Sequence, residues 1–172
     1  MRTSILCLVG CLVVAGCAVH PNKGDRAPTF NAKLDSGREA TLEQLMGDKG
    51  VVLYFYPKDE TPGCTTQACE FQDKLIEFQD LGYRVVGVSV DTGESHQAFK
   101  SKHTLTFDLV ADTKKEIAAL YNIPTEADPV GTVGFRRTTF LIARDGRIVS
   151  RLEQPDPKEQ VYMALERIRQ PF

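Results

Sequence analysis

Apolar residues along this chain occur partly in uninterrupted runs and partly at helical spacings. Residues 51–56 (VVLYFY) are six consecutive apolar or aromatic residues that stop at Pro57. Such a run predicts a strand covered on both faces, so we expect it to be the central strand of a sheet. Further strand-like runs lie at 85–90, 107–110, 138–143 and 146–150.

The segment after Pro57 has the periodicity of a helix that packs one face against a core. Its apolar residues recur at steps of three and four and stop before Gly82, a common helix terminator. These residues are Ala68, Phe71, Leu75, Phe78 and Leu81. Shorter helices are expected at 95–103 and 114–121, and Asp156-Pro157 predicts the N-cap and first residue of a last helix.

The order of these elements predicts the fold class. A small hairpin at 29–39 and a short helix opened by the Thr41/Gln44 capping box come before the central strand. Strands and helices then alternate, and a hairpin around Asp145-Gly146 comes late. We therefore expect one α/β domain with a thioredoxin-like fold, in which a central mixed sheet has helices on both faces.

The N-terminus has a different pattern. A short positive start precedes an apolar run at 4–14, which is too short to span a bilayer and fits a secretory signal. Val14-Ala15-Gly16-Cys17 resembles the lipobox of bacterial lipoproteins, in which the cysteine is acylated; a plain secretion signal is the alternative. The expected organisation is a signal peptide at 1–16, an acylated tether at 17–26 and the domain at 27–172.

The cysteines of the mature chain reduce to one pair. Cys7 and Cys11 would leave with the signal and Cys17 would carry lipid, so Cys64 and Cys69 remain. Residues five apart in a helix lie about 8–9 Å apart at Cα, whereas a disulfide needs roughly 4.4–6.8 Å. A permanent disulfide would therefore contradict the helical pattern, and a bond that forms only when the helix opens is expected.

The residues before Cys64 predict a reactive sulfur. Thr61 suits an N-cap and Pro62 a first helical residue, so Cys64 falls in the first turn, where free N–H groups and the helix dipole favour a thiolate. A thiolate alone gains only about 30-fold over an ordinary thiol at pH 7. A fast peroxidase would also need groups that polarise the peroxide, for which Thr61 and Arg137 are the candidates.

The run YFYPKDETPGCTTQAC resembles the active site of peroxiredoxins of the Q type, also called bacterioferritin comigratory proteins. The similarity continues through VGVSVDTGESHQAFKSKHTLTFDLVAD and GFRRTTFLIARDG. The resemblance implies that Cys64 is the peroxidatic cysteine, Cys69 the resolving one, and Thr61 a hydrogen-bond partner of the peroxide. It also implies that Pro57 shields the thiolate and that Arg137, rather than the exposed Arg136, faces the sulfur.

The expected partners follow from this reading. The substrate is a hydroperoxide and the reductant a thioredoxin-like protein, with no metal or organic cofactor. We expect a monomer, anchored in the membrane through Cys17 on the periplasmic face of the bacterial cell envelope, at the outer membrane. The 21 basic and 23 acidic residues are spread along the chain without blocks, so charge predicts no nucleic-acid partner.

Three other readings compete. An envelope thiol-disulfide oxidoreductase would share the fold but would normally carry Cys-x-x-Cys. A zinc site would combine Cys64 and Cys69 with His96 and His103, although the spacing of the histidines is unusual. A Cys-His nucleophile would need one of these histidines beside Cys64, whereas we expect both on a polar helix face.

Overall fold

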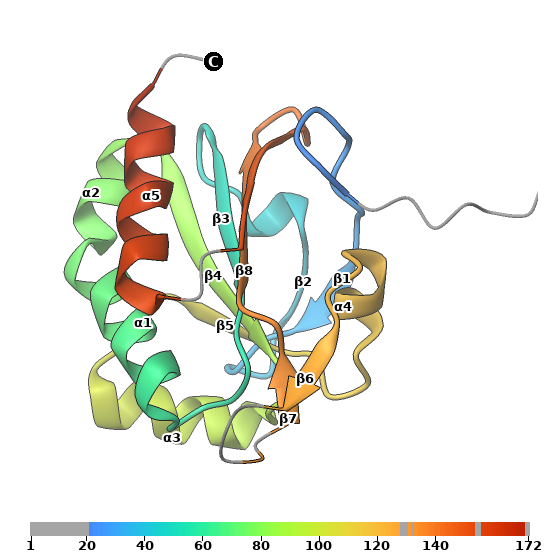
Figure 1. The fold of residues 1–172 in the computed structure, drawn as a ribbon, viewed down its shortest axis with the longest axis vertical. Coiled ribbons are helices and arrows are strands. Elements are labelled where there is room, and N and C mark those ends of the chain that lie inside the picture. The colour runs from blue at the N-terminus through green and yellow to red at the C-terminus, as the bar shows by residue number, and fades with distance from the viewer. Residues whose placement is uncertain (1–20, 128–130, 132, 154–155, 171–172) are drawn as a thin grey trace, which may run out of the picture.

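The computed structural model describes residues 21–127, 131, 133–153 and 156–170. Its centre is a five-stranded sheet of order β5-β4-β3-β8-β9 (Figure 1). The strands are β3 (Gly50–Phe55), β4 (Tyr83–Ser89), β5 (Asp108–Ala111), β8 (Thr138–Ala143) and β9 (Ile148–Leu152). β3, β4 and β5 run parallel, whereas β8 is antiparallel to both β3 and β9. The apolar run is therefore the central strand of a mixed sheet, as predicted.

Helices cover both faces of this sheet, which confirms the predicted layers. Side chains from β3 alternate between two apolar clusters, with Leu53 in one and Tyr54 in the other. The first face is covered by β1 (Asn31–Lys33), β2 (Glu39–Thr41), the 3-10 turn η1 (Glu43–Leu45) and α4 (Glu116–Leu120). The second is covered by α1 (Pro62–Asp73), α2 (Leu75–Asp80), α3 (Gly93–His103) and α5 (Pro157–Arg169). Figure 1 shows α1, α2 and α5 together on one side.

Two predicted helix starts form as their capping residues require. The Thr41 N–H donates to the Gln44 side chain at 2.9 Å, and the Gln44 N–H donates back to the Thr41 hydroxyl at 3.4 Å. The helix that follows is shorter than expected, a single 3-10 turn. At the start of α5, the Asp156 carboxylate accepts the Glu159 N–H at 2.8 Å and Pro157 is the first helical residue.

The fold departs from the predicted elements in two places. The single helix expected over Ala68 to Leu81 is divided, because Lys74 (φ −98°, ψ 4°) leaves helical geometry between α1 and α2. Its apolar periodicity continues across the break, which hides it in the sequence. A further hairpin, β6 (Thr125–Ala127) with β7 (Val133–Phe135), was not predicted.

The folded domain also begins earlier than predicted. Residues 21–26 were expected in the tether, but they bond to the β8–β9 hairpin: Gly24 N–H donates to the Ile148 carbonyl and Ile148 N–H to the Asp25 carbonyl. The signal peptide at 1–16 and the lipidation site Cys17 lie outside the described residues. Within the described part of the chain, no helix has the length and apolarity needed to cross a membrane.

Candidate active site

Cys64 lies in the first turn of α1, where the chain enters the helix from the end of β3. Its side chain is buried, with 1% of its surface exposed. Thr61 occupies the N-cap position in extended conformation, as predicted, but its hydroxyl does not cap the helix. It donates instead to the Lys58 carbonyl at 3.1 Å. The N–H groups of the first turn are thus left without a side-chain cap, which suits an anion at Cys64.

Arg137 reaches Cys64 from the neighbouring strand. Thr138, the first residue of β8, pairs with Phe55, the last of β3, so the residue before it stands beside the start of α1. The Arg137 Nη2 atom donates to Cys64 Sγ at 3.5 Å. A Cβ at Gly63 would lie only 3.3 Å from Nη2, so glycine gives the guanidinium room. Arg136, by contrast, is exposed and paired with Glu126, as expected.

A buried amide network that the sequence analysis missed fixes this guanidinium. Arg137 Nη1 donates to Gln67 Oε1, and Gln67 Nε2 donates to Gln160 Oε1 at 2.7 Å. The Thr139 hydroxyl donates to the same Gln160 oxygen at 2.7 Å. Both glutamines are 0% exposed. The position of Gln67, three residues after Cys64 on the same helix face, was the available signal.

The electrostatics of this arrangement favour a thiolate. Among the described residues, Arg137 donates its terminal N–H groups to Gln67 and Cys64 rather than to a carboxylate. A guanidinium beside the positive end of a helix forms a site that stabilises an anion, and the Cys64 sulfur lies within it. Burial, followed by the Cys64 charge, raises the pKa of Tyr54 well above its ordinary value, so this neighbouring phenol stays neutral.

The remaining predicted site residues are Cys69, later in α1, and Pro57, in the loop between β3 and α1. Cys69 is a free, half-buried thiol in the middle of α1. Burial and the nearby Asp73 charge raise its pKa, so it remains protonated near neutral pH. Pro57 is packed against β7: a Cβ at Gly134 would lie 2.1 Å from the Pro57 carbonyl oxygen. The β6–β7 hairpin therefore fixes the segment that leads to Thr61.

His96 does not lie on a polar helix face, and that expectation was wrong. Its side chain is 0% exposed. Its Nδ1 lies 2.9 Å from Asp59 Oδ2 and its Nε2 lies 3.2 Å from the Val110 carbonyl. His103 contacts Glu60 instead of a cysteine, and among the described residues no group of His, Cys, Asp and Glu side chains is placed to hold a metal ion.

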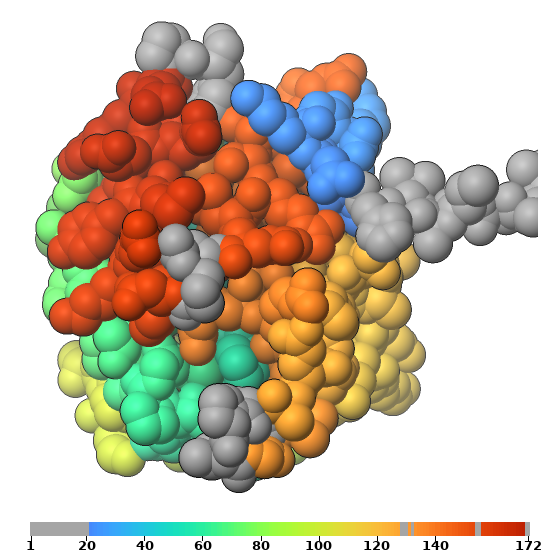
Figure 2. Space-filling model, in the orientation of Figure 1, coloured from blue at the N-terminus to red at the C-terminus, as the bar shows by residue number. Residues whose placement is uncertain are grey.

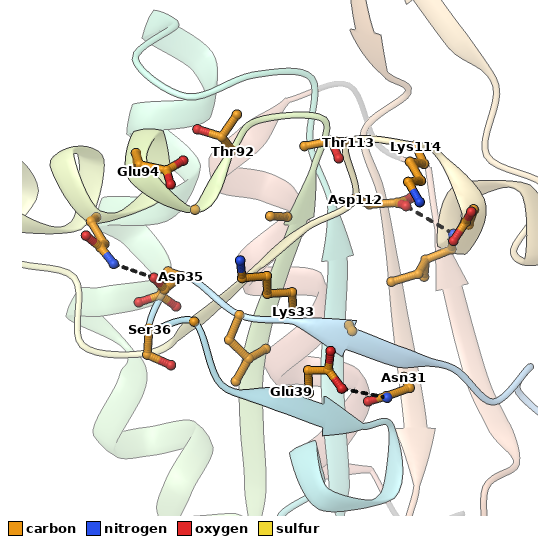
Figure 3. Close-up of a pocket in the computed structure, with 18 residues that line it drawn as sticks. Asn31, Lys33, Asp35, Ser36, Glu39, Thr92, Glu94, Asp112, Thr113 and Lys114 are labelled. Atoms are coloured by element: carbon orange, nitrogen blue, oxygen red, sulfur yellow. Dashed lines mark hydrogen bonds between the residues drawn. The ribbon is translucent and has the colours of Figure 1, made fainter.

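Two of the hollows in the structure could admit a small molecule, and one of them lies beside the predicted site. One of about 400 Å³ is lined by Glu126, Arg136, Arg137 and Glu153 and so opens beside the sulfur's partner. Figure 2 shows the teal segment between β3 and α1 at the surface on this side, next to the orange β6–β7 hairpin. The other, of about 530 Å³, lies between the β1–β2 hairpin and the start of α3 (Figure 3). It contains none of the predicted site residues.

A buried cysteine at a helix start, held against a fixed guanidinium in a thioredoxin-like fold, defines a thiol-dependent peroxidase. The comparisons agree. The model of the AhpC/TSA family matches residues 23–151. Peroxiredoxin Bcp of Bacillus subtilis is 38% identical over 148 residues, which cover 85% of this chain and 94% of the relative. Chloroplastic peroxiredoxin Q of Sedum lineare is 44% identical over 119 residues, 69% of this chain and 62% of the relative.

Solved structures show the same similarity. The crystal structure of peroxidoxin BcpB from Mycobacterium tuberculosis has a TM-score of 0.80 at 28% identity and covers 87% of this chain and 97% of that one. The crystal structure of a cysteine-to-serine mutant of PrxQ from Xylella fastidiosa has a TM-score of 0.77 at 31% identity, covering 86% and 96%. The chain belongs to the AhpC/TSA family and, within it, to the peroxiredoxins of the Q/Bcp type. It is a peroxiredoxin with the predicted thioredoxin-like fold.

Proposed function

We propose that Cys64 carries the peroxidase chemistry and that Cys69 resolves it. The Cys64 thiolate attacks the terminal oxygen of a hydroperoxide, the O–O bond breaks, and the departing oxygen leaves as water or an alcohol after taking a proton. Cys64 is then a sulfenic acid. The observation that carries this proposal is the 3.5 Å contact between Arg137 Nη2 and Cys64 Sγ at the start of α1.

Arg137 and Thr61 would raise the rate of the reaction with peroxide beyond what ionisation of Cys64 alone can give. The guanidinium stabilises the thiolate and the charge that develops on the peroxide oxygens as the O–O bond lengthens. Thr61 already donates its hydrogen to the Lys58 carbonyl. Its oxygen is therefore available to accept the O–H of a hydroperoxide and to hold the substrate in line with the sulfur.

Resolution would require α1 to unwind. Cys64 and Cys69 are both free and lie in one helix, about 8–9 Å apart at Cα by helical geometry. Disulfide formation needs roughly 4.4–6.8 Å, so the turns between them must open. The Cys69 thiol then attacks the Cys64 sulfenic acid, and a disulfide and water form. A thioredoxin-like dithiol reduces this disulfide and restores both thiols.

The test of this cycle uses the two serine variants. With peroxide and a dithiol reductant, Cys64→Ser abolishes peroxide consumption, whereas Cys69→Ser, assayed without a thiol reductant, consumes one equivalent and stops at the sulfenic acid. Intact mass after one equivalent of peroxide shows the loss of two hydrogens in the parent chain, mapped to a Cys64–Cys69 peptide. Continued turnover by Cys64→Ser, or an unchanged mass in the parent chain, refutes the cycle.

We also propose that the mature chain is a monomeric lipoprotein of the cell envelope, acylated at Cys17 and held at the periplasmic face of the outer membrane. The folded domain already includes residue 21, so a tether of residues 17–20 spans at most about 14 Å and keeps the domain close to the bilayer. Its reductant is then a thioredoxin-like protein of the envelope. Cys17→Ala releases the protein from the membrane fraction and removes the lipid mass; a soluble parent chain without lipid contradicts the anchor.

A further inference from the structure

Polar side chains from several elements form a buried cluster below the loop that joins β3 to α1. Tyr56 precedes the loop and Asp59 lies within it, whereas Asp91 follows β4 and His96 lies on α3. They are 1%, 5%, 9% and 0% exposed. The Asp59 carboxylate accepts the Tyr56 hydroxyl at Oδ1 and the Ser95 hydroxyl at Oδ2, each at 2.7 Å. The cluster is therefore held together by its own hydrogen bonds, separately from the contact between the sulfur and the guanidinium.

Both ring nitrogens of His96 have hydrogen-bond partners. Val110 offers a carbonyl oxygen 3.2 Å from Nε2, and a carbonyl only accepts, so Nε2 carries a hydrogen. Nδ1 lies 2.9 Å from Asp59 Oδ2, and two lone pairs at this distance would repel each other. A hydrogen therefore lies between them. The ring is therefore hydrogen-bonded to the Asp59 carboxyl group, and the Tyr56 hydroxyl lies 3.4 Å from the same Nδ1 atom.

The phenol of Tyr56 is neutral in this cluster. Burial, then the charges of neighbouring groups including Asp59, raises the pKa of Tyr56 well above its ordinary value. The phenol therefore keeps the hydrogen that it donates to Asp59. The second carboxylate in the cluster, Asp91, accepts the Ser89 hydroxyl at 2.7 Å and the Asp59 N–H at 2.9 Å. His96 is the basic side chain that contacts Asp59 in this cluster.

One peptide unit connects the cluster to Thr61. The Asp59 N–H donates to Asp91, and the carbonyl of the same peptide, that of Lys58, accepts the Thr61 hydroxyl at 3.1 Å. A peptide is planar, so fixing its N–H side also fixes the direction of its carbonyl. The backbone between this peptide and Thr61 is strained, because Glu60 adopts a left-handed conformation with φ 62°. The loop therefore needs an anchor to keep this geometry.

We propose that His96, as a buried imidazolium paired with Asp59, is a positioning residue that orients the Thr61 hydroxyl toward the peroxide. The proposal rests on the peroxidase function assigned to Cys64. His96 acts through Asp59 and the Lys58–Asp59 peptide, whereas Arg137 is held separately by Gln67. Loss of His96 thus disturbs the hydroxyl side of the site and leaves the guanidinium side in place.

Kinetics on a His96→Gln variant separate this role from a general structural one. Misplacing a positioning group by about 1 Å costs up to roughly 100-fold in rate, so we expect the rate constant of Cys64 with hydrogen peroxide to fall about 10- to 100-fold. Alkylation of Cys64 by iodoacetamide does not use the Thr61 hydroxyl, and its rate should change less than about twofold. A peroxide rate that is unchanged, or a parallel fall in both rates, overturns the proposal.

A matched control and a double variant sharpen the result. His103 lies on the same helix and contacts Glu60 of the same loop at 3.5 Å, but at the surface. His103→Gln should leave both rates within about twofold, because Glu60 is exposed and keeps its ion pair with Lys102. In a Thr61→Val background, His96→Gln should lower the rate constant with hydrogen peroxide little further, because both changes remove the contribution of the same hydroxyl. Additive losses contradict action through Thr61.

Nitrogen NMR of the parent chain tests the cluster even if the variant fails to fold. Selective ¹⁵N labelling of histidine should show both His96 ring nitrogens protonated at pH 7. A nitrogen with the shift of an unprotonated imidazole refutes the imidazolium. The two proposals fail differently: a parent chain whose Cys64 does not react with peroxide refutes the peroxidase cycle, whatever the protonation of His96.

Discussion

Replacing Arg137 by lysine tests the guanidinium side of the site. The guanidinium makes two side-chain hydrogen bonds, one from Nη2 to Cys64 Sγ and one from Nη1 to Gln67. A lysine keeps the charge but not the planar fork, so it loses about one charge-assisted bond. Such a bond is worth about 1.5–3 kcal/mol, which corresponds to a rate loss of roughly 10- to 150-fold.

The assay compares Arg137→Lys with a change at the neighbouring arginine. The chain contains no tryptophan, so the rate constant of Cys64 with hydrogen peroxide is best measured by competition with a haem peroxidase of known rate. Arg136→Lys alters an exposed ion pair with Glu126 and should change the rate by less than about fivefold. Equal losses in the two variants, or a loss below about fivefold for Arg137→Lys, would refute the assigned role.

Three further predictions concern the loop, the resolving thiol and a helix end. Gly134→Ala places a Cβ 2.1 Å from the Pro57 carbonyl oxygen, so urea unfolding should show a loss of about 1–3 kcal/mol together with lower peroxidase activity; a fully active, equally stable variant contradicts this packing. Asp73→Asn removes a charge that, after burial, raises the pKa of Cys69. More of this thiol is then ionised at pH 8, so quenched-flow mass spectrometry should show faster disulfide formation. An unchanged or slower rate of disulfide formation would show that the Asp73 charge does not limit this step. Thr104 ends α3 in left-handed conformation with φ 57°, so Thr104→Gly should raise the free energy of unfolding by about 0.5–1 kcal/mol, and a decrease would contradict the strain.

The sequence predicts this fold wherever one local signal is strong. Six apolar residues in a row identify β3 as the central strand, and Asp156-Pro157 places the start of α5 at the correct residue. The break at Lys74 escapes prediction because helical periodicity continues on both sides of it. The β6–β7 hairpin has short, mostly exposed strands with little apolar pattern, so only its tertiary pairing reveals it.

The candidate site divides in the same way. The helix start predicts where Cys64 and Thr61 lie, and the resemblance predicts Arg137. The partners that hold these groups come from distant segments: Gln160 is 93 residues from Gln67 in sequence, and His96 is 37 from Asp59. Pairing at that separation leaves no local pattern. A histidine three residues before a buried phenylalanine, Phe99, was still a sign that His96 faces the core.

The most direct test of the central claim compares Cys64 with free cysteine in the reaction with hydrogen peroxide at pH 7. Complete ionisation of an ordinary thiol raises its rate by at most about 30-fold at this pH. Because we propose that Arg137 and Thr61 act on the peroxide itself, the measured ratio should exceed this ceiling by orders of magnitude, with Cys64→Ser as the blank. A ratio of about 30 or less would mean that the site only ionises the sulfur, and would contradict a peroxidase mechanism in which Arg137 and Thr61 act on the substrate.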